Sequence, residues 1–186
     1  MELWIVAGVA ALVAIYVIGS FNRLVTLRYR VRDAWAQIDV QLKRRHDLIP
    51  NLVNAVKGYL DHERNMMESV TRAREQAVAA GSGSSISVRA AAESALSAVT
   101  GRMMALAEAY PTLRASENML ALQEDLASTE NRIAFARQFY NDSVMEYNAA
   151  RATFPRNLLA APFGFAAAEM FAMDDPGQRT APQVRV

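Results

Sequence analysis

The most constraining feature of the sequence is an uncharged, strongly apolar stretch at residues 3–22. At about 1.5 Å per residue, a helix of about 20 residues spans about 30 Å, which matches the hydrocarbon core of a bilayer. A helix also satisfies its own backbone hydrogen bonds, as hydrocarbon requires. Trp4 and Tyr16 stand near the two ends, where amphipathic rings favour the membrane interface. The stretch predicts a transmembrane anchor over residues 1–21.

A cleaved signal peptide is the alternative interpretation of this stretch. Signal peptides carry positive charge before the apolar run, whereas Met1 and Glu2 precede it here. The positive charge comes after it, ahead of the first acid at Asp33. This pattern favours a retained anchor, and because positive flanks stay in the cytoplasm, we expect the N-terminus outside and the bulk of the chain inside. The positive residues are Arg23, Arg28, Arg30 and Arg32.

These four arginines allow two interpretations. They are topology signals, or they also contact anionic lipid, where each basic residue gains on the order of 1 kcal/mol. The two roles are compatible, so the sequence leaves both open.

Helix breakers are sparse between residues 22 and 155, and apolar residues recur there at steps of three and four. This pattern predicts helices at about residues 22–46, 49–80, 86–108 and 113–153, the first continuing the membrane helix. No segment alternates like a strand. The sequence therefore predicts an all-α protein in which residues 22–155 form an antiparallel, up-and-down bundle of about four long helices. On the third helix the expected apolar stripe is Val88, Ala92, Ala95, Val99, Met103 and Leu106.

Pro50 leaves the join between the first two helices open. Proline suits the first turn of a helix, where its missing N–H is not needed, and Asp47 is a plausible N-cap. Alternatively, Pro50 kinks one long helix. We favour a turn at Pro50, and we expect a flexible Gly/Ser loop at residues 81–85.

The composition excludes several functional classes. The chain has no cysteine and a formal net charge of +1, which argues against disulfides, thiolate metal sites and generic nucleic-acid binding. His62 opens a near match to a zinc-protease motif, but Met66 stands where the second histidine belongs. The sequence thus predicts no cofactor, no metal site and no catalytic residue.

Two polar segments are candidate partner surfaces or internal networks. An enzymatic interpretation makes Glu130 a base near Arg45. The favoured alternative is a polar network that fixes helix register, because buried polar groups need partners. The candidate residues are Lys43, Arg44, Arg45, Asp47, Asn51, Asn54, Glu130, Asn131, Arg132 and Asn141.

The C-terminal region changes character. Residues 156–173 are rich in large apolar side chains, so this segment should fold over the bundle or touch the membrane surface or a partner. Residues 174–186 are expected to be a disordered tail.

Several motifs resemble those of the LemA family of bacterial membrane proteins. The longest are AWAQIDVQLKRRHDLIPNLVNAVKGYLDHE at residues 34–63 and TENRIAFARQFYNDSVMEYN at residues 129–148. FPRNL at 154–158 and FGF at 163–165 resemble the family's C-terminal ending. The resemblance covers about residues 15–171. It implies a single-pass protein of the bacterial inner membrane, with its N-terminus outside and a helical cytoplasmic domain.

The LemA family has no established catalytic activity, so the resemblance supplies no active-site residues. One branch of the family includes a magnetosome-membrane protein, and other members occur beside membrane proteases or envelope proteins. We expect a membrane-anchored scaffold or adaptor that takes part in protein assembly or envelope organisation. The alternatives are a lipid-binding, membrane-organising protein, in a magnetosome-like or envelope-stress role, and, less favoured, an enzyme. Homo-oligomerisation stays open: Ala7 and Ala11 have a spacing that permits close helix crossing.

Overall fold

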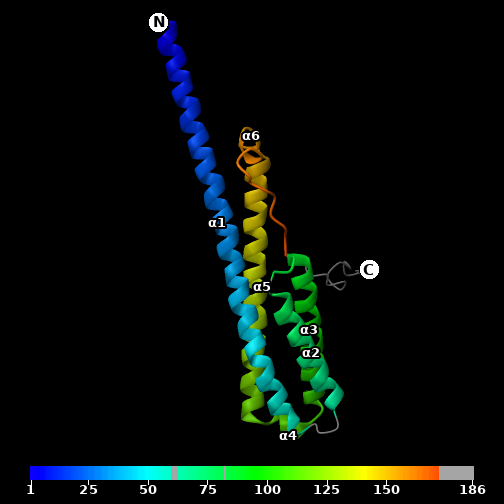
Figure 1. Cartoon of the computed structure of the whole chain (residues 1–186). Coiled ribbons are helices and arrows are strands. Elements are labelled where there is room, and N and C mark those ends of the chain that lie inside the picture. Colours follow the sequence, from blue (N-terminus) through cyan, green and yellow to red (C-terminus); the bar gives the residue numbers. More distant parts are fainter. Residues whose placement is uncertain (60–62, 82, 172–186) are drawn as a thin grey trace, which may run out of the picture. The chain divides into compact units, whose positions relative to one another are not determined.

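The computed structural model describes residues 1–59, 63–81 and 83–171. Within these ranges the chain is helical and has no strand, which confirms the all-α prediction. The helices are α1 (Glu2–Lys57), α2 (Arg64–Ala80), α3 (Ile86–Glu108), α4 (Pro111–Arg114), α5 (Glu117–Ala152) and α6 (Asn157–Ala160), shown in Figure 1. The up-and-down order of a bundle stays a prediction, and the tail expected at 174–186 lies outside the described residues.

The chain divides into two compact units. The first contains Met1–Val40 and Ala134–Met170, and the second contains Gln41–Ile133 together with Phe171 among the described residues. Helices α1 and α5 each contribute to both units. The predicted boundaries at residues 21, 155 and 173 stay predictions.

The apolar first part of α1 is the one segment among the described residues that is long and apolar enough to cross a membrane. Its large side chains from Leu3 to Ile18 are exposed, except Val17, which is half-buried. A helix whose apolar residues face outward all round suits a lipid environment. This agrees with the predicted span.

The predicted turn at Pro50 is wrong, because α1 runs through Pro50 to Lys57. A proline at position 50 cannot donate to the carbonyl four residues earlier, which belongs to His46. In the structure the Nε atom of Arg74, on α2, donates to that oxygen at 2.7 Å. A side chain from another helix thus replaces the missing backbone bond. Asp47, expected as an N-cap, is an exposed residue inside α1.

Local signals explain the other helix boundaries. The Ser85 hydroxyl caps α3 by accepting a hydrogen bond from the Val88 amide. Pro111 occupies the first turn of α4, where it needs no donor. The single helix predicted at 113–153 is therefore two elements, α4 and α5, whereas the prediction for 86–108 matches α3.

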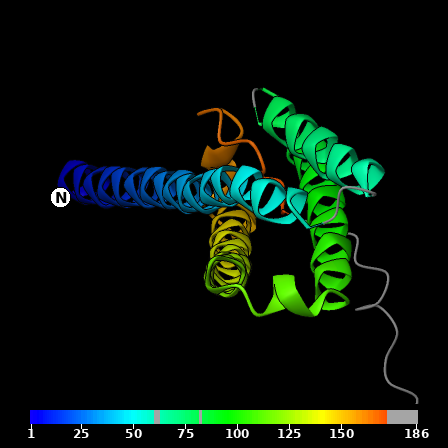
Figure 2. The ribbon, with the colours of Figure 1, turned by 90° about the horizontal axis from the view of Figure 1, so that it is seen from below.

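The second unit has a continuous apolar core built from five helices. Helices α2 and α3 pack side by side in it, as Figures 1 and 2 both show. The stripe predicted for α3 is partly wrong: Val88 is exposed, and the buried face is Ala90, Glu93, Leu96, Thr100, Met103 and Ala107. The core consists of Ile49, Leu52, Val56, Val70, Ala73, Ala77, Leu96, Met103, Ala107, Leu113, Met119 and Leu126.

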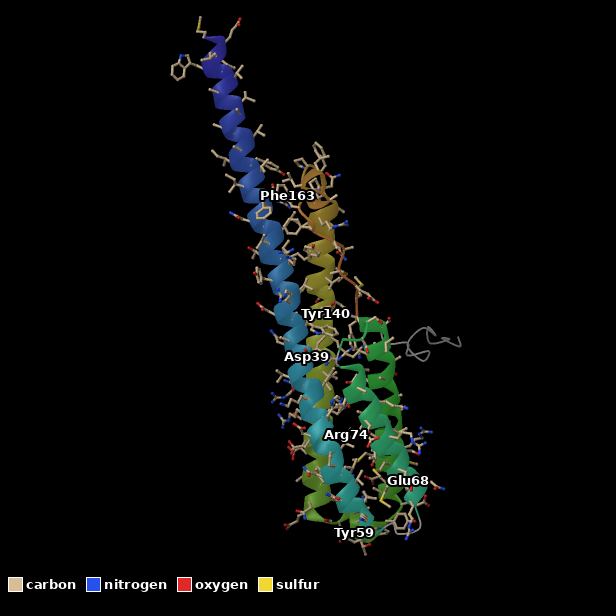
Figure 3. All side chains as sticks on the ribbon, viewed as in Figure 1. Asp39, Tyr59, Glu68, Arg74, Tyr140 and Phe163 are labelled. Carbon is tan, nitrogen blue, oxygen red and sulfur yellow. The ribbon has the colours of Figure 1, made fainter. Side chains whose placement is uncertain are left out.

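The first unit joins the start of α1 to the end of α5. Apolar residues of both helices are buried at steps of three and four, and the Trp35 ring meets the Tyr140 ring edge-on at 5.2 Å. Figure 3 labels Tyr140 at this position. The buried apolar residues of this unit include Leu24, Leu27, Val31, Ala34, Ile38, Ala136, Tyr140, Val144 and Tyr147.

Because Arg74 replaces the backbone hydrogen bond that Pro50 cannot make, the effects of substitutions at positions 50 and 74 should depend on each other. Arg74→Met should lower the free energy of unfolding by about 1–3 kcal/mol, because it leaves the His46 carbonyl unsatisfied. Pro50→Ala supplies an amide at the missing position, so the same Arg74→Met change should cost less in that background. Chemical denaturation of the full-length protein in detergent, followed by helical circular dichroism, measures both costs.

Arg72→Met is the matched control, because Arg72 is an exposed arginine on the same helix. Equal costs of Arg74→Met with and without Pro50→Ala would contradict the proposed replacement of one donor by the other.

Candidate functional site

A buried arginine lies at the centre of the second unit. Arg45 on α1 and Glu93 on α3 are each 2% exposed, and their side chains form an ion pair. Glu93 pairs with the Nη2 atom of Arg45, and the Nη1 atom donates to Glu130 Oε1 on α5 at 2.9 Å and to Ser97 Oγ on α3 at 2.6 Å. The guanidinium therefore connects three helices. We call Arg45, His46, Glu93, Ser97 and Glu130 the arginine cluster.

His46 adds a fourth helix to the arginine cluster. Its Nε2 atom lies 3.0 Å from Glu93 Oε1. Its backbone carbonyl accepts the hydrogen bond from Arg74 of α2. Two adjacent residues of α1 thus contact α2, α3 and α5 within one turn.

The arginine cluster keeps Glu93 ionised. Burial alone would raise the pKa of the Glu93 carboxyl, because an apolar environment disfavours charge. The hydrogen bond from His46 and the positive charge of Arg45 outweigh burial, so the pKa lies below its ordinary value. The ion pair is therefore fully formed at neutral pH.

This geometry suits a structural network better than catalysis. The sequence pairs Arg45 with Glu130, and the structure brings these two side chains together. Both Glu130 oxygens accept from the same guanidinium nitrogen, at 2.9 and 3.2 Å. Because Arg45 is enclosed, a substrate could reach it only if a helix moved. The cluster can fix helix register, because the Arg45–Glu93 pair is buried and the Glu130 carboxylate, which is 42% exposed, already accepts from Arg45.

The other candidates on α1 form an exposed face. Lys43, Asp47, Asn51 and Asn54 are all exposed, and their spacing of four, four and three residues places them on one side of the helix. We call these four residues the polar ridge. Arg44 lies beside the ridge and pairs with Asp125 on α5 at 2.9 Å.

A groove adjoins the end of the polar ridge. It lies between α1 and α2 and has a volume of about 710 Å³. Asn54 belongs to both the ridge and the groove, and Figure 3 labels Glu68 on the α2 side. The groove is lined by apolar, basic and acidic side chains. A protein surface, which carries all three kinds of group, matches this lining better than a small ligand that is wholly apolar or of one charge. Its lining is Val53, Asn54, Lys57, Arg64, Met67, Glu68, Thr71, Arg72 and Glu75.

The remaining candidates lie on α5. Asn131 and Arg132 are exposed in the second unit, next to Glu130. Asn141 is partly buried and belongs to the first unit. The ten candidates are therefore not one surface.

The four membrane-proximal arginines have different environments in the first unit. Arg23 and Arg30 both pair with Glu146 of α5, at 2.6 and 2.7 Å. The Arg28 guanidinium lies over the Phe165 ring at 5.1 Å, and that of Arg32 lies over the Tyr29 ring at 5.8 Å. Glu146 thus neutralises part of the positive charge that a lipid surface would meet.

Side chains of α5 hold the C-terminal segment by its backbone. Asn148 donates to the Ala168 carbonyl at 2.9 Å and accepts from the Ala168 amide at 3.0 Å. The Tyr147 hydroxyl donates to the Ala166 carbonyl at 2.8 Å, and Arg151 donates to the Phe165 carbonyl at 2.6 Å. Sequence reasoning missed this role, although Tyr147 and Asn148 end one of the distinctive motifs.

Tyr140 is a further contact of this kind. Its hydroxyl donates to the Glu169 carbonyl at 2.8 Å. Burial, and next the charge of Glu169, raise the pKa of the Tyr140 hydroxyl. The hydroxyl therefore stays protonated and remains a donor.

Metal binding finds no support in the part of the chain that the structure describes. No group of three or more histidine, aspartate, glutamate or cysteine side chains there is arranged to hold a metal ion. His62, the first residue of the near match to a zinc motif, lies outside the described residues.

Comparison with known proteins agrees with the motifs. The LemA family model matches residues 34–186. Magnetosome protein MamQ of Magnetospirillum gryphiswaldense is 25% identical over 92% of this chain and 72% of its own length. Magnetosome proteins MamQ 1 and MamQ 2 of Paramagnetospirillum magneticum are each 27% identical over 81% of this chain. The matched region covers 64% of the length of each of these two relatives. These names describe no catalytic activity.

The buried ion pair generates a stability prediction. Glu93→Gln should lower the free energy of unfolding by about 3–5 kcal/mol, because it leaves Arg45 without its enclosed counter-charge. Since the pKa of Glu93 is lower in the folded state, its contribution is present above the ordinary value of 4.5 and is lost as pH falls through the folded-state pKa. Glu93→Gln should therefore weaken the dependence of stability on acid pH.

Thermal and chemical denaturation at a series of pH values provides the measurement. Glu108→Gln is the control, because Glu108 is about half exposed and pairs with Arg114 at 3.3 Å. That change should cost about 0–1 kcal/mol. Similar losses for the two variants would contradict the role given to Glu93.

Proposed function

Because this chain belongs to the LemA family and is a membrane-associated protein with one candidate span, we propose that it is a non-enzymatic, membrane-anchored scaffold or adaptor. In this proposal α1 spans the bacterial inner membrane with its N-terminus outside, and the helical units lie in the cytoplasm. The polar ridge and the adjoining groove bind a protein partner. The family name and the relatives' names support a role at a membrane without naming a reaction.

The contrast between the arginine cluster and the polar ridge carries the proposal. The cluster buries the ion pair between Arg45 and Glu93, which suits a fixed framework. The ridge leaves four polar side chains exposed along one face of a helix that this framework holds. A rigid helix with exposed hydrogen-bonding groups is a suitable surface for recognising another protein.

The relatives support an organising role in a membrane-bound assembly. Two species supply relatives that are named magnetosome proteins. The chain matches less than two thirds of the length of two of these relatives. For this chain we propose only the general role, as a structural component of a membrane-bound protein assembly. A second copy of the chain is one candidate partner, since Ala7 and Ala11 permit close contact between two spans.

Site-specific photo-crosslinking in cells tests the docking face. A benzophenone amino acid at Asn51 or Asn54 should give discrete adducts with a protein partner, because both residues are exposed on the polar ridge. Lys43→Glu reverses a charge on the same ridge and should reduce those adducts several-fold. Immunoblotting and mass spectrometry measure the adducts and identify the partner.

Asn118 is the matched control position, since it is an exposed asparagine on α5. Crosslinks of equal yield from Asn118, or adducts that are unaffected by Lys43→Glu, would contradict docking at the ridge.

Lipid organisation is the second candidate function. It is favoured by the membrane-proximal arginines, all four of which are exposed. Arg23 and Arg30 pair with Glu146, whereas the guanidinium groups of Arg28 and Arg32 lie over aromatic rings. Exposed cations close to a span attract anionic headgroups. This function and protein docking are compatible, because they use different residues.

Native mass spectrometry of the full-length protein extracted from membranes tests this candidate. The double change Arg28→Gln and Arg32→Gln should reduce bound anionic phospholipid, because it removes two of the four exposed cations beside the span. Arg102→Gln with Arg114→Gln is the control, since both arginines are exposed in the second unit. Unchanged anionic lipid in the first double variant would contradict this function.

A further inference from the structure

An apolar notch lies within the first unit, between α1 and the segment around α6. We use the name apolar notch for this cavity of about 430 Å³. Tyr16 carries the only polar side-chain atom among the lining residues. The lining is Leu12, Val13, Tyr16 and Val17 on one wall and Pro155, Leu158 and Leu159 on the other.

The notch lies beside the apolar part of α1 that is predicted to span the membrane. All four α1 residues of the lining precede Arg23, the first charged residue after Glu2. On the other wall, residues 154–165 form what we call the C-terminal hairpin. Its Phe163 and Phe165 rings meet the Phe21 ring edge-on at 5.3 and 5.5 Å. Figure 3 labels Phe163 beside α1. The C-terminal hairpin therefore lies alongside the end of the apolar part of α1 and reaches the guanidinium of Arg28 through Phe165.

The C-terminal hairpin presents an apolar surface of its own. Phe154 is 74% exposed, Leu158 is 63% exposed and Phe163 is 53% exposed. Residues 157–168 contain no charged side chain. Contiguous large apolar groups that face outward indicate contact with a membrane or a partner. Since this surface lies beside a span, lipid is the environment that matches it.

We propose that the apolar notch binds an acyl chain of a membrane phospholipid. At the depth of the span the surroundings are hydrocarbon, and a gap between two apolar walls is filled rather than left empty, because unfilled space forfeits dispersion contacts. A flexible hydrocarbon chain can enter from the surrounding bilayer and match both walls. The lining offers one hydroxyl, which is too little to hold a polar ligand.

The packing at Phe21 holds the C-terminal hairpin against α1. Phe165 is 2% exposed, and its backbone carbonyl accepts the hydrogen bond from Arg151. The C-terminal hairpin is thereby also fixed to α5. The second wall is consequently a fixed part of the unit, and the notch does not depend on a mobile segment. The proposal rests on α1 lying in a membrane and is independent of the scaffold role.

Photolabelling tests the proposal directly. The full-length protein is placed in nanodiscs of phosphatidylethanolamine and phosphatidylglycerol that contain a trace of phospholipid with a diazirine on one acyl chain. After irradiation, peptide mass spectrometry should find label on residues 155–159 as well as on the span. Val13→Trp fills the notch from the α1 wall and should reduce label on residues 155–159 by about fivefold or more.

Val6→Trp is the matched control, because Val6 is an exposed valine of the same apolar segment and does not line the notch. It should leave the label on residues 155–159 unchanged. Leu159→Trp fills the notch from the opposite wall and should reduce label on residues 12–17, so the test does not depend on one variant. Circular dichroism confirms that each variant remains helical.

Three results would overturn the proposal. The first is wild-type protein without label on residues 155–159. The second is equal label there in Val13→Trp and wild type. The third is a crosslink between two protein chains when a benzophenone amino acid replaces Leu158, which would show that a second copy occupies the notch in place of lipid.

Discussion

A guanidinium enclosed by helices has to be matched by carboxylates, because an unpaired buried charge costs several kcal/mol. Arg45 receives this match from Glu93 and Glu130, which lie on two different helices. A rotation of either helix would move a carboxylate away from the guanidinium. The apolar core of the second unit could tolerate such a shift, since apolar contacts are not directional. The arginine cluster therefore determines how α1, α3 and α5 are rotated about their axes, and the polar ridge faces outward as a result.

The fold was predictable from the sequence wherever the signals were local. The bounds of α3 match because a serine cap begins the helix and a tyrosine–proline pair follows it. The break between α4 and α5 was also within reach, since Ser116 followed by Glu117 is a typical helix start. The failure at Pro50 is of another kind. The donor that keeps the helix intact comes from Arg74, 28 residues from His46, and sequence spacing does not reveal it.

The candidate site was only partly predictable. Arg45 and Glu130 stand in conspicuous polar motifs, so their association could be proposed from the residues. Glu93 is as important to the arginine cluster as these two residues, but it stands in an alanine-rich helix. Because both faces of that helix carry many alanines, the sequence does not show which face is buried. The position of Glu93 three residues from Ala90 and from Leu96, both buried, is the signal that could have identified it. Because the two faces of α3 differ so little in composition, the apolar spacing predicts a buried stripe that begins at Val88, whereas Val88 is exposed in the structure.

The side chain of Asn148 binds the C-terminal segment through the backbone amide and the backbone carbonyl of Ala168. Every amino acid has this carbonyl, and every one except proline has this amide. Tyr147 and Tyr140 likewise donate to backbone oxygens. Substitution of the side chains at residues 166–169 would therefore leave these backbone contacts in place. Because an amide has no proton to gain or lose near neutrality and makes no ion pair, this fastening is indifferent to ionic strength, unlike the arginine contacts with Glu146 in the same unit.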